Sequence, residues 1–294
     1  MTRKSHGEKV FDTINNTILA LILIIVAYPL YFVVIASISD PIDVALGRVI
    51  LIPSKIVWDG YKKILAHKDL WIGYKNTFTY TILGTLLNLS LTLTSAYSLS
   101  RKDMPGRNLF MGIFTFTMFF GGGLIPTYLL VKSLNLIDTY AVMIVLGAVS
   151  VWNVIIARTF FQSTIPQELL EAAIVDGCND FLFFFRIVLP LSKAIIAVLT
   201  IYYAVGHWNQ FFNAIIYLRN RNKYPLQLFL REILIQNQFN EEMQIMDDNA
   251  LIAQTIAMSM KYGVIIVSSL PVLILYPFLQ KYFMKGVMIG SIKG

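Results

Sequence analysis

The 294-residue sequence predicts an all-α, polytopic membrane protein with six transmembrane helices in a single domain, residues 1–294. Three observations predict this class: 56% of the residues are apolar, only 14% are charged, and the charges cluster between long apolar runs. A soluble domain of this length would have more apolar residues than one core can bury. A bilayer core about 30 Å thick requires roughly 20 apolar residues per spanning helix, so the chain is long enough for six spans.

The six predicted spans are residues about 14–38, 76–99, 109–131, 139–160, 194–218 and 262–283. The first of them follows Arg3, Lys4 and Lys9, as the core of a secretory signal would. It is longer than the roughly 7 to 15 residues of a signal core, and no convincing small-residue cleavage site follows it. We therefore predict an uncleaved first span.

The third span contains Gly121, Gly122 and Gly123, followed by Pro126. Such a glycine run resembles a phosphate-binding loop only in a soluble βα context. Within an apolar span, Gly and Pro are tolerated where neighbouring groups satisfy the backbone. The run therefore predicts a bent or closely packed helix.

An even number of spans places both termini on one side of the membrane. Lys and Arg residues divide about equally between the two sides, so only the short loops indicate the orientation. Arg101, Lys102 and Arg107 lie between spans two and three, whereas the next loop carries Lys132. Because positive charge is enriched in cytoplasmic loops, both termini are predicted to be cytoplasmic.

The long connection at residues 219–261 contains the stretch YPLQLFLREIL, which has the spacing of an amphipathic helix. Its apolar face comprises Leu226, Phe229, Leu230, Ile233 and Leu234. This pattern fits either a helix that lies in the membrane interface or a surface that docks a partner.

A more polar stretch, EAAIVDGCNDFLFFFRIVLPLS, separates spans four and five at residues 171–192. Pro166 suits a first helical turn, which predicts a short helix over Glu168–Asp176, and Gly177 is placed to end it. A second short helix through FLFFFRIVL is expected to stop near Pro190. Two short helices in a loop expose apolar and charged surface, and such a surface is costly unless a partner covers it.

The spacing of this stretch resembles the complete EAA signature of permease subunits of bacterial ABC importers. The signature comprises Glu171-Ala172-Ala173, then Gly177 after three residues, Ile187 after nine more, and Leu189-Pro190 after one more. The segments FFGGGLIPTYLLVKSLNLIDTYAVMI, RTFFQSTIPQELLEAA, WNQFFNAIIYLRN and KGVMIGSIKG resemble maltose-transporter-type carbohydrate permeases, particularly the oligosaccharide and polysaccharide-fragment branch. The resemblance covers about residues 10–294, although the run Phe183–Phe185 is bulkier than the family pattern.

The resemblance implies an ABC importer type I permease fold in which residues 161–192, the coupling loop, dock in a cleft on a cytoplasmic ATPase. The residues that it assigns to coupling are Glu171, Ala172, Ala173, Asp176, Gly177, Ile187, Leu189 and Pro190. It also implies a homologous second permease subunit as a heterodimer partner, two ABC ATPase subunits and an extracytoplasmic sugar-binding lipoprotein. The location implied is the bacterial cytoplasmic membrane, with the chain in contact with lipid and both termini in the cytoplasm.

The chain contains no Gly-Lys dipeptide, so it cannot carry the phosphate-cradling GxxxxGK[ST] loop. No cofactor is therefore expected on this chain, and Mg-ATP is expected in the partner ATPase subunits. From their chemistry, we expect Glu171 to offer a carboxylate to a basic group of the ATPase and Gly177 to permit a sharp turn. The apolar residues of the loop are expected to pack in the cleft.

A substrate path should be marked by polar groups inside the spans, because such groups are costly when they face lipid. The fifth span offers the densest set, spaced by three or four residues so as to share one helical face: Tyr203, His207, Gln210, Asn213 and Tyr217, flanked by Trp208 and Asn209. Further candidates are Asn88, Trp152 and Asn153. Amides and aromatic rings suit a sugar, but hydrogen bonding between helices accounts for the same residues.

Several function classes are disfavoured. The single Cys178 excludes an intramolecular disulfide and a Cys-based zinc cage, and it fits a small packed residue. His6, His67 and His207 lack metal-ligand spacing, and the basic residues form no continuous patch for nucleic acid.

An ion-coupled secondary transporter is the alternative function, although no obvious pair of intramembrane carboxylates supports it. An intramembrane enzyme would need a catalytic cluster, and none is recognisable.

Overall fold

The structure is a computed structural model of the whole chain that describes residues 5–242 and 260–274. Within these residues the regular elements are helices, and an isolated bridge pairs Ser39 with Ile56. Packing divides the chain into two units, residues 1–68 with 230–270 and residues 69–229 with 271–294.

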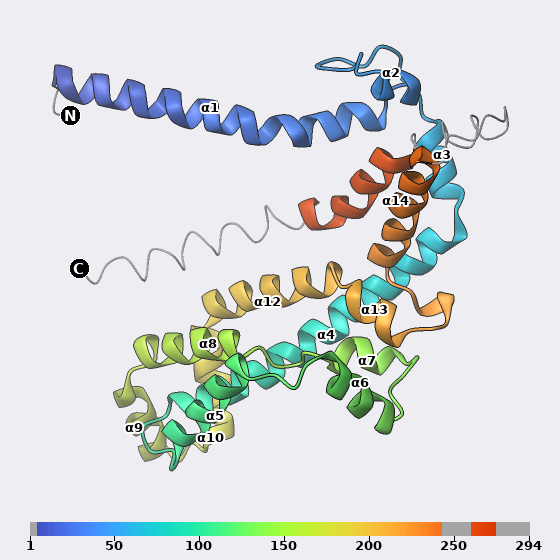
Figure 1. The fold of residues 1–294 in the computed structure, drawn as a ribbon. Helices are drawn as coiled ribbons and strands as arrows, with labels where there is room; N and C mark the ends of the chain where they lie inside the picture. Colours follow the sequence, from blue (N-terminus) through green and yellow to red (C-terminus); the bar gives the residue numbers. More distant parts are fainter. Residues whose placement is uncertain (1–4, 243–259, 275–294) are drawn as a thin grey trace. The chain divides into compact units, whose positions relative to one another are not determined.

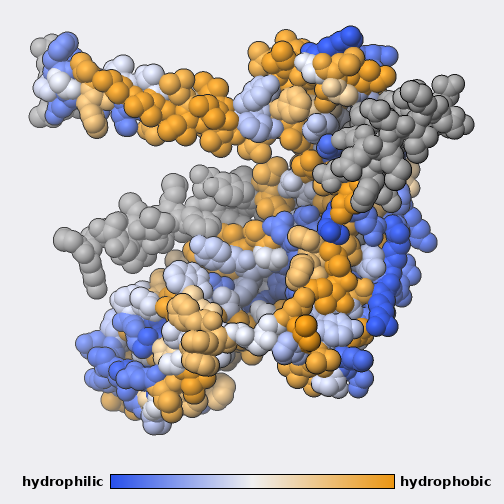
Figure 2. Space-filling view, in the orientation of Figure 1, coloured by the Kyte–Doolittle hydropathy of each residue, from blue (hydrophilic) through white to orange (hydrophobic). Residues whose placement is uncertain are grey.

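The first helix, α1 (His6–Ser37), confirms the first predicted span. It begins with a capping box, in which the Glu8 N–H donates to Ser5 Oγ and the Ser5 N–H donates to Glu8 Oε2. Its 32 residues extend about 48 Å at about 1.5 Å per residue, more than a bilayer core requires. Its apolar side chains are exposed along the helix (Figure 2).

The rest of the first unit packs short helices against the end of α1. These are α2 (Pro41–Ala45), α3 (Asp59–Ala66) and the helix Met260–Ile274. The Tyr61 hydroxyl donates to Ser37 Oγ at 2.8 Å, and the rings of Phe32 and Tyr262 meet edge to face. The helix Met260–Ile274 covers the first half of the sixth predicted span, and residues 275–283 of that span lie outside the described residues.

The second unit is built on α4 (Lys68–Ser100), an unbroken 33-residue helix that confirms the second predicted span. In Figure 1, α5, α8, α9 and α10 gather at its C-terminal end, and α6, α7 and α13 lie nearer its other end. Two buried clusters account for this arrangement. Leu93, Ala96 and Leu99 belong to the cluster at the C-terminal end, and Tyr80 belongs to the other.

The third, fourth and fifth predicted spans are broken into pairs of helices. The pairs are α5 (Arg107–Phe119) with α6 (Leu124–Ser133), α7 (Tyr140–Val145) with α8 (Val151–Thr164), and α12 (Lys193–Trp208) with α13 (Phe212–Tyr217). The described helices provide two candidate spans by length and composition, α1 and α4. The count rises to four if two sharply bent pairs each count as one span, namely α5 with α6 and the segment Asp180–Leu191 with α12. The six-span count therefore stays a prediction.

Local backbone chemistry explains these breaks. Gly123 and Gly147 have φ values of 84° and 80°, in the left-handed region that glycine adopts without a side-chain clash. The bend predicted at the glycine run is present, and α5 and α6 meet at 113°. After α12, the Asn209 side chain donates to the Val205 carbonyl, and the Gln210 N–H bonds three residues back, to His207. Such side-chain bonding competes with continuation of the helix.

The amphipathic stretch predicted in the long connection forms α14 (Leu226–Glu242). Four residues of its apolar face are buried within the chain, namely Leu226, Phe229, Leu230 and Ile233. This face is therefore covered by the protein itself. It is neither a helix face that lies on lipid nor a surface that is free to dock a partner.

Hydrogen bonds and an ion pair at Asp138, here called the Asp138 cluster, join residues 134–139 to residues 218–223 in the second unit. Asp138 Oδ1 accepts hydrogen bonds from the N–H groups of Arg219 and Asn220, both at 3.1 Å, and Asp138 Oδ2 pairs with Lys223 at 3.2 Å. The hydrogen bond from the Asn220 N–H is the largest cause that holds the pKa of Asp138 below its ordinary value of 3.8.

Acid is expected to weaken the Asp138 cluster, because it protonates the Asp138 carboxylate. Because the folded pKa of Asp138 is lowered, its contribution to stability is fully present above pH 3.8 and is lost as the pH falls through the folded pKa. Asp138→Asn should lower the melting temperature near neutral pH by at most about 4 °C, because the ion pair is partly exposed. Thermal unfolding measured from neutral to acidic pH tests this: the deficit should shrink in acid, and a deficit independent of pH would contradict the assignment.

Candidate functional site

The first half of the coupling loop forms the predicted short helix and turn. Helix α9 (Gln167–Val175) begins after Pro166 and ends at Asp176. Gly177 then has a φ of 73°, its N–H donates to the Ile174 carbonyl, and the Cys178 N–H donates to the Ala173 carbonyl at 2.8 Å. This left-handed ending satisfies carbonyls that the helix leaves open. Gly177 thus ends the helix as predicted.

The second half of the coupling loop contains an element that its sequence did not indicate. Asn179 caps α10 (Asp180–Phe183), accepting from the Leu182 N–H at 2.8 Å. The chain continues as a π-helix, Phe184–Val188, and as α11 (Leu189–Leu191). Helical structure ends at Ser192, close to the predicted stop at Pro190, although Pro190 itself lies inside α11.

The structure divides the predicted coupling residues into two groups. Ala173 is buried, and Ile187 and Leu189 are half-buried against the same cluster, so these three hold the loop to the rest of the unit. The residues that remain exposed are Glu171, Ala172, Asp176, Gly177 and Pro190. This exposed group is the part of the motif that can reach a partner.

Apolar side chains lie exposed beside this group. Val175 is 87% exposed and Phe181 is 79% exposed. Figure 2 shows hydrophobic and hydrophilic side chains intermixed over the region of α9 and α10. Of the three consecutive phenylalanines, Phe183 and Phe184 are buried and Phe185 faces outward. Such a mixed surface has the composition of one that a partner covers.

Polar and aromatic contacts join the coupling loop to the end of α4. Arg101 Nη1 donates to Asp180 Oδ1 at 2.6 Å. Arg158 Nε, on α8, donates to the Leu99 carbonyl at 2.9 Å and so joins α8 to the same end of α4. The ring of Tyr97 lies 5.0 Å from that of Phe184, centroid to centroid. The hydrogen bond that Arg101 donates to Asp103 is the largest cause that raises the pKa of Arg101, and the same bond lowers the pKa of Asp103. These groups are therefore charged at neutral pH.

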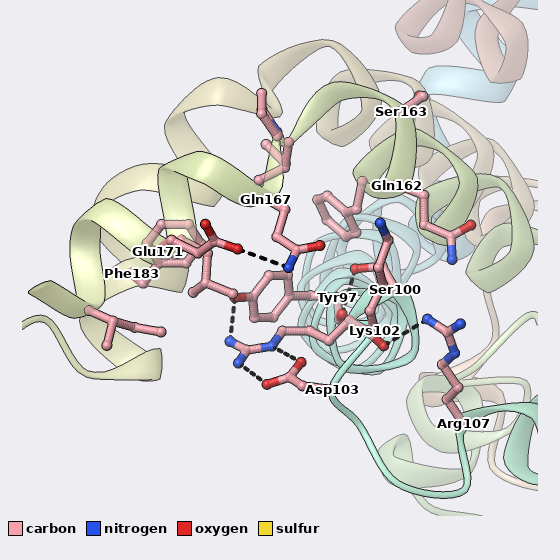
Figure 3. A pocket seen from close by; sticks show the side chains of 16 residues that line it. Tyr97, Ser100, Lys102, Asp103, Arg107, Gln162, Ser163, Gln167, Glu171 and Phe183 are labelled. Atoms are coloured by element: carbon pink, nitrogen blue, oxygen red, sulfur yellow. Dashed lines mark hydrogen bonds and ion pairs between the residues drawn. The ribbon is translucent and has the colours of Figure 1, made fainter.

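A hollow of about 570 Å³ lies between α9 and the end of α4 (Figure 3). Its lining comes from the end of α4 and the following loop, the end of α8 and the start of α9. Figure 3 shows Gln167 Nε2 bonded to Glu171 Oε1 at 3.0 Å on one side, and Tyr97 and Asp103 on the other. The hollow leaves this side of α9 uncovered by the chain.

A second set of polar residues, the polar cluster, joins α4 to α12. It comprises Asn88, Thr92, Tyr203, His207 and Gln210. Asn88 Nδ2 donates to the carbonyls of Gly147 and Ala148, so its Oδ1 faces His207 Nε2 at 2.7 Å and accepts the ring proton. Thr92 and Tyr203 share a hydrogen bond of 2.6 Å.

The prediction that five residues of the fifth span share one helical face is wrong. The break at residues 209–211 places Tyr217 on α13, where it is buried in the other cluster and stacks on Tyr128. Asn213 is half-buried on α13, and Asn209 is exposed, with its Oδ1 accepting from Gln227 at 3.3 Å. On α8, Asn153 is buried and Trp152 is exposed. The structure therefore brings together Asn88, Tyr203, His207 and Gln210, and it separates Tyr217 from them.

Sequence reasoning missed three residues of these sites. In the sequence, Arg101 indicates only the charge of its loop, and no pattern marks Asp180. Gly84 lies one helical turn before Asn88, and an added Cβ there would come within 2.8 Å of His207 Cδ2 and nearer still to two other ring atoms. The signal for Gly84 was its spacing of four residues from Asn88, since such residues share a helix face.

Within residues 5–242 and 260–274, no group of three or more His, Cys, Asp or Glu side chains is arranged to hold a metal ion. Cys178 is half-buried, and its Sγ lies 3.6 Å from the Asn179 carbonyl. The chemistry of both sets of residues is hydrogen bonding and packing.

Known proteins resemble this chain over almost its full length. Residues 70–289 match the family described as binding-protein-dependent transport system inner membrane component. The chain is 39% identical over 288 residues to the polygalacturonan/rhamnogalacturonan transport system permease protein YtcP of Bacillus subtilis (strain 168), covering 98% of this chain and 99% of that protein. It is 38% identical over 290 residues to Protein LplC of the same organism, covering 99% and 97%.

A solved structure shares the fold. It is the crystal structure of a bacterial ABC transporter involved in the import of the acidic polysaccharide alginate, and one of its chains matches with a TM-score of 0.85 and 32% identity, covering 96% of this chain and 100% of that chain. The family match spans well over half of the present sequence. This chain therefore belongs to the binding-protein-dependent transport system inner membrane components, and it is a membrane permease subunit of an ABC importer, not an enzyme.

Proposed function

We propose that this chain forms, with a related subunit, the alternating-access pathway for an oligosaccharide across the bacterial cytoplasmic membrane. The observation that carries the proposal is the 39% identity, over nearly the whole chain, to a permease named for polygalacturonan and rhamnogalacturonan transport. Family membership does not favour the alternative of an ion-coupled secondary transporter. Uptake by the chain without an ATPase would revive that alternative.

The proposed partners are a homologous second permease in a heterodimer, two ATPase subunits that bind Mg-ATP, and an extracytoplasmic sugar-binding lipoprotein. The coupling loop would contact the ATPase in the cytoplasm, with both termini on the same side. The exposed Glu171 and the uncovered Val175 and Phe181 support this contact, because they combine a carboxylate with apolar surface. The buried Ala173 would hold the loop in place from within.

In the proposed mechanism, ATP-driven closure of the ATPase pair moves the coupling loop, and the spans switch between inward-facing and outward-facing access. The loop can act as a rigid body because buried Phe183 and Phe184 and the capped turn at Gly177 fix its shape. The ATPase pair supplies the energy of transport, and this chain supplies the coupling loop that moves and the spans that form the path.

Reconstitution tests the function directly. The chain should co-purify with an ATPase and a second permease, and the complex in liposomes should take up glycans when ATP and the binding protein are supplied. Binding of that protein to a panel of oligosaccharides, including fragments of polygalacturonan, rhamnogalacturonan and alginate, would then identify the cargo. Absence of any ATPase partner, or uptake of no carbohydrate, would contradict the proposal.

The polar cluster is proposed as part of the substrate path. Gln210 is half-buried, so its amide can reach a passing hydroxyl. Gln210→Ala should raise the substrate concentration for half-maximal uptake by about 2- to 10-fold, the effect of one neutral hydrogen bond, without loss of assembly. Asn213→Ala should act in the same direction, with the exposed Asn108→Ala as the control. Unchanged uptake in both Gln210→Ala and Asn213→Ala, with normal assembly, would remove these residues from the path.

A further inference from the structure

The end of α4 carries an arginine that three other groups hold in place. Arg101 is only 14% exposed, although it follows the last residue of the helix. Its Nη1 donates to Asp180 Oδ1 at 2.6 Å, its Nε donates to Asp103 Oδ1 at 2.8 Å, and Nη1 also lies 3.3 Å from the Tyr97 hydroxyl. A planar guanidinium bonded on several sides has little freedom to turn.

The two carboxylates that meet Arg101 have different positions in the chain. Asp103 lies two residues away, in the loop after α4, so that pair is local. Asp180 begins α10 in the coupling loop, 79 residues away in sequence. The Asp180 pair is therefore the one that connects the coupling loop to α4.

The hollow separates one side of α9 from the end of α4 (Figure 3). Because of this gap, the second half of the coupling loop, which carries Asp180, offers a route by which movement of α9 can reach α4. There the ring contact of Tyr97 with Phe184 is apolar, whereas the Arg101–Asp180 pair is short and directional. A directional ion pair resists sliding more than a ring contact does.

Movement at this end of α4 would reach the polar cluster. The helix has no break between Lys68 and Ser100, and Asn88 lies about 20 Å from Arg101 along it at about 1.5 Å per residue. Asn88 is bonded to His207 on α12. A shift of α4 along or about its axis therefore changes the position of Asn88 against α12.

We infer that Arg101 is a positioning residue that passes the movement of the coupling loop to α4 through its ion pair with Asp180. The inference rests on the proposed function, because it requires an ATPase that moves the loop. It assigns to Arg101 a role in coupling rather than in folding. The Asp180 side chain is 71% exposed, and an exposed ion pair contributes little to folding stability.

Matched substitutions in the complete reconstituted transporter test this inference. Asp180→Asn removes the connection to the coupling loop, Asp103→Asn removes only the local pair, and Asp180→Glu keeps a carboxylate. The readout is glycan taken up per ATP hydrolysed. We expect Asp180→Asn to lower this ratio at least about 5-fold while the ATPase stays bound, and we expect Asp103→Asn and Asp180→Glu to leave it near the wild-type value. An equal or larger loss in Asp103→Asn, or no loss in Asp180→Asn, would overturn the inference.

A distance measurement separates the inference from the identity of the cargo. Spin labels at Ser90→Cys on α4 and Glu168→Cys on α9, in a Cys178→Ser background, should keep one separation when ATP is added to the complex. In Asp180→Asn the separation should change with ATP. A separation that changes with Asp180 intact, or that stays constant in Asp180→Asn, would contradict the inference even if the transporter carries no oligosaccharide. Failure of glycan uptake with these distances as expected would contradict only the proposed function.

Discussion

Gly84→Ala is expected to destabilise the packing of α4 against α12 by about 3 kcal/mol, at the upper end of overpacking effects. An added Cβ at this position would overlap the ring of His207, coming within 2.8 Å of Cδ2 and nearer to Nε2 and Cε1. The ring cannot turn away freely, because it is buried and Asn88 holds its Nε2. The two helices must separate, or the hydrogen bond must break.

Thermal unfolding of the detergent-solubilised chain measures this effect. Gly206→Ala is the matched control, because Gly206 precedes His207 on the same α12 and an added Cβ there meets nothing within 4 Å. The control should be neutral or stabilising by about 0.5–1 kcal/mol, since alanine is the better helix former. Equal stability of the Gly84 and Gly206 variants would show that α4 and α12 do not approach each other at this point.

Gly177→Pro is expected to abolish binding of the ATPase and uptake of substrate. Gly177 has a φ of 73°, whereas proline requires a φ near −65°, and its N–H bond to the Ile174 carbonyl would be lost. The turn between α9 and α10 would rearrange, at a cost of about 3 kcal/mol or more. Glu171 and Phe181 lie on opposite sides of this turn, so their surfaces would no longer form one docking face.

Co-purification of the ATPase with the variant, followed by uptake in liposomes, measures the result. Gly177→Asn is the control, because asparagine adopts the left-handed region more readily than other residues with a side chain and keeps the N–H group. The Asn variant should retain the ATPase and most uptake. If the Pro variant retained both, the turn would have no part in coupling.

The sequence was sufficient to predict the helical class, the helices α1 and α4, and α9 with its ending at Gly177. These elements have strong local signals, namely long apolar runs and a glycine after a short periodic segment. It indicated the bend at the glycine run after Phe119, but it did not reveal the break after Trp208, because apolar composition shows that a segment suits the membrane and not that its helix is continuous. The glycine at position 123 signalled one break, but the Asn209 side-chain bond that accompanies the other depends on tertiary context.

The EAA pattern predicts where the coupling loop lies, but it does not show which of its members face outward. Ala173 belongs to the same short motif as Glu171, and only the packed structure shows that it is turned into the core. Arg101 and Asp180 are 79 residues apart in sequence, and no spacing rule connects such a pair. Contacts of this kind follow from how the helices pack, and local pattern cannot supply them.

The π-helix Phe184–Val188 makes the coupling loop sensitive to its own length. An α-helix turns by about 100° per residue, and a π-helical turn accommodates about one residue more than an α-helical turn does. The segment after it, with Pro190, is therefore offset in helical phase from α10, which carries Asp180. Loss of a single residue here would remove that offset, and gain of one would double it, without changing the motif on either side. The number of residues between Asp180 and Pro190, and not their identity alone, therefore decides whether Asp180 faces Arg101.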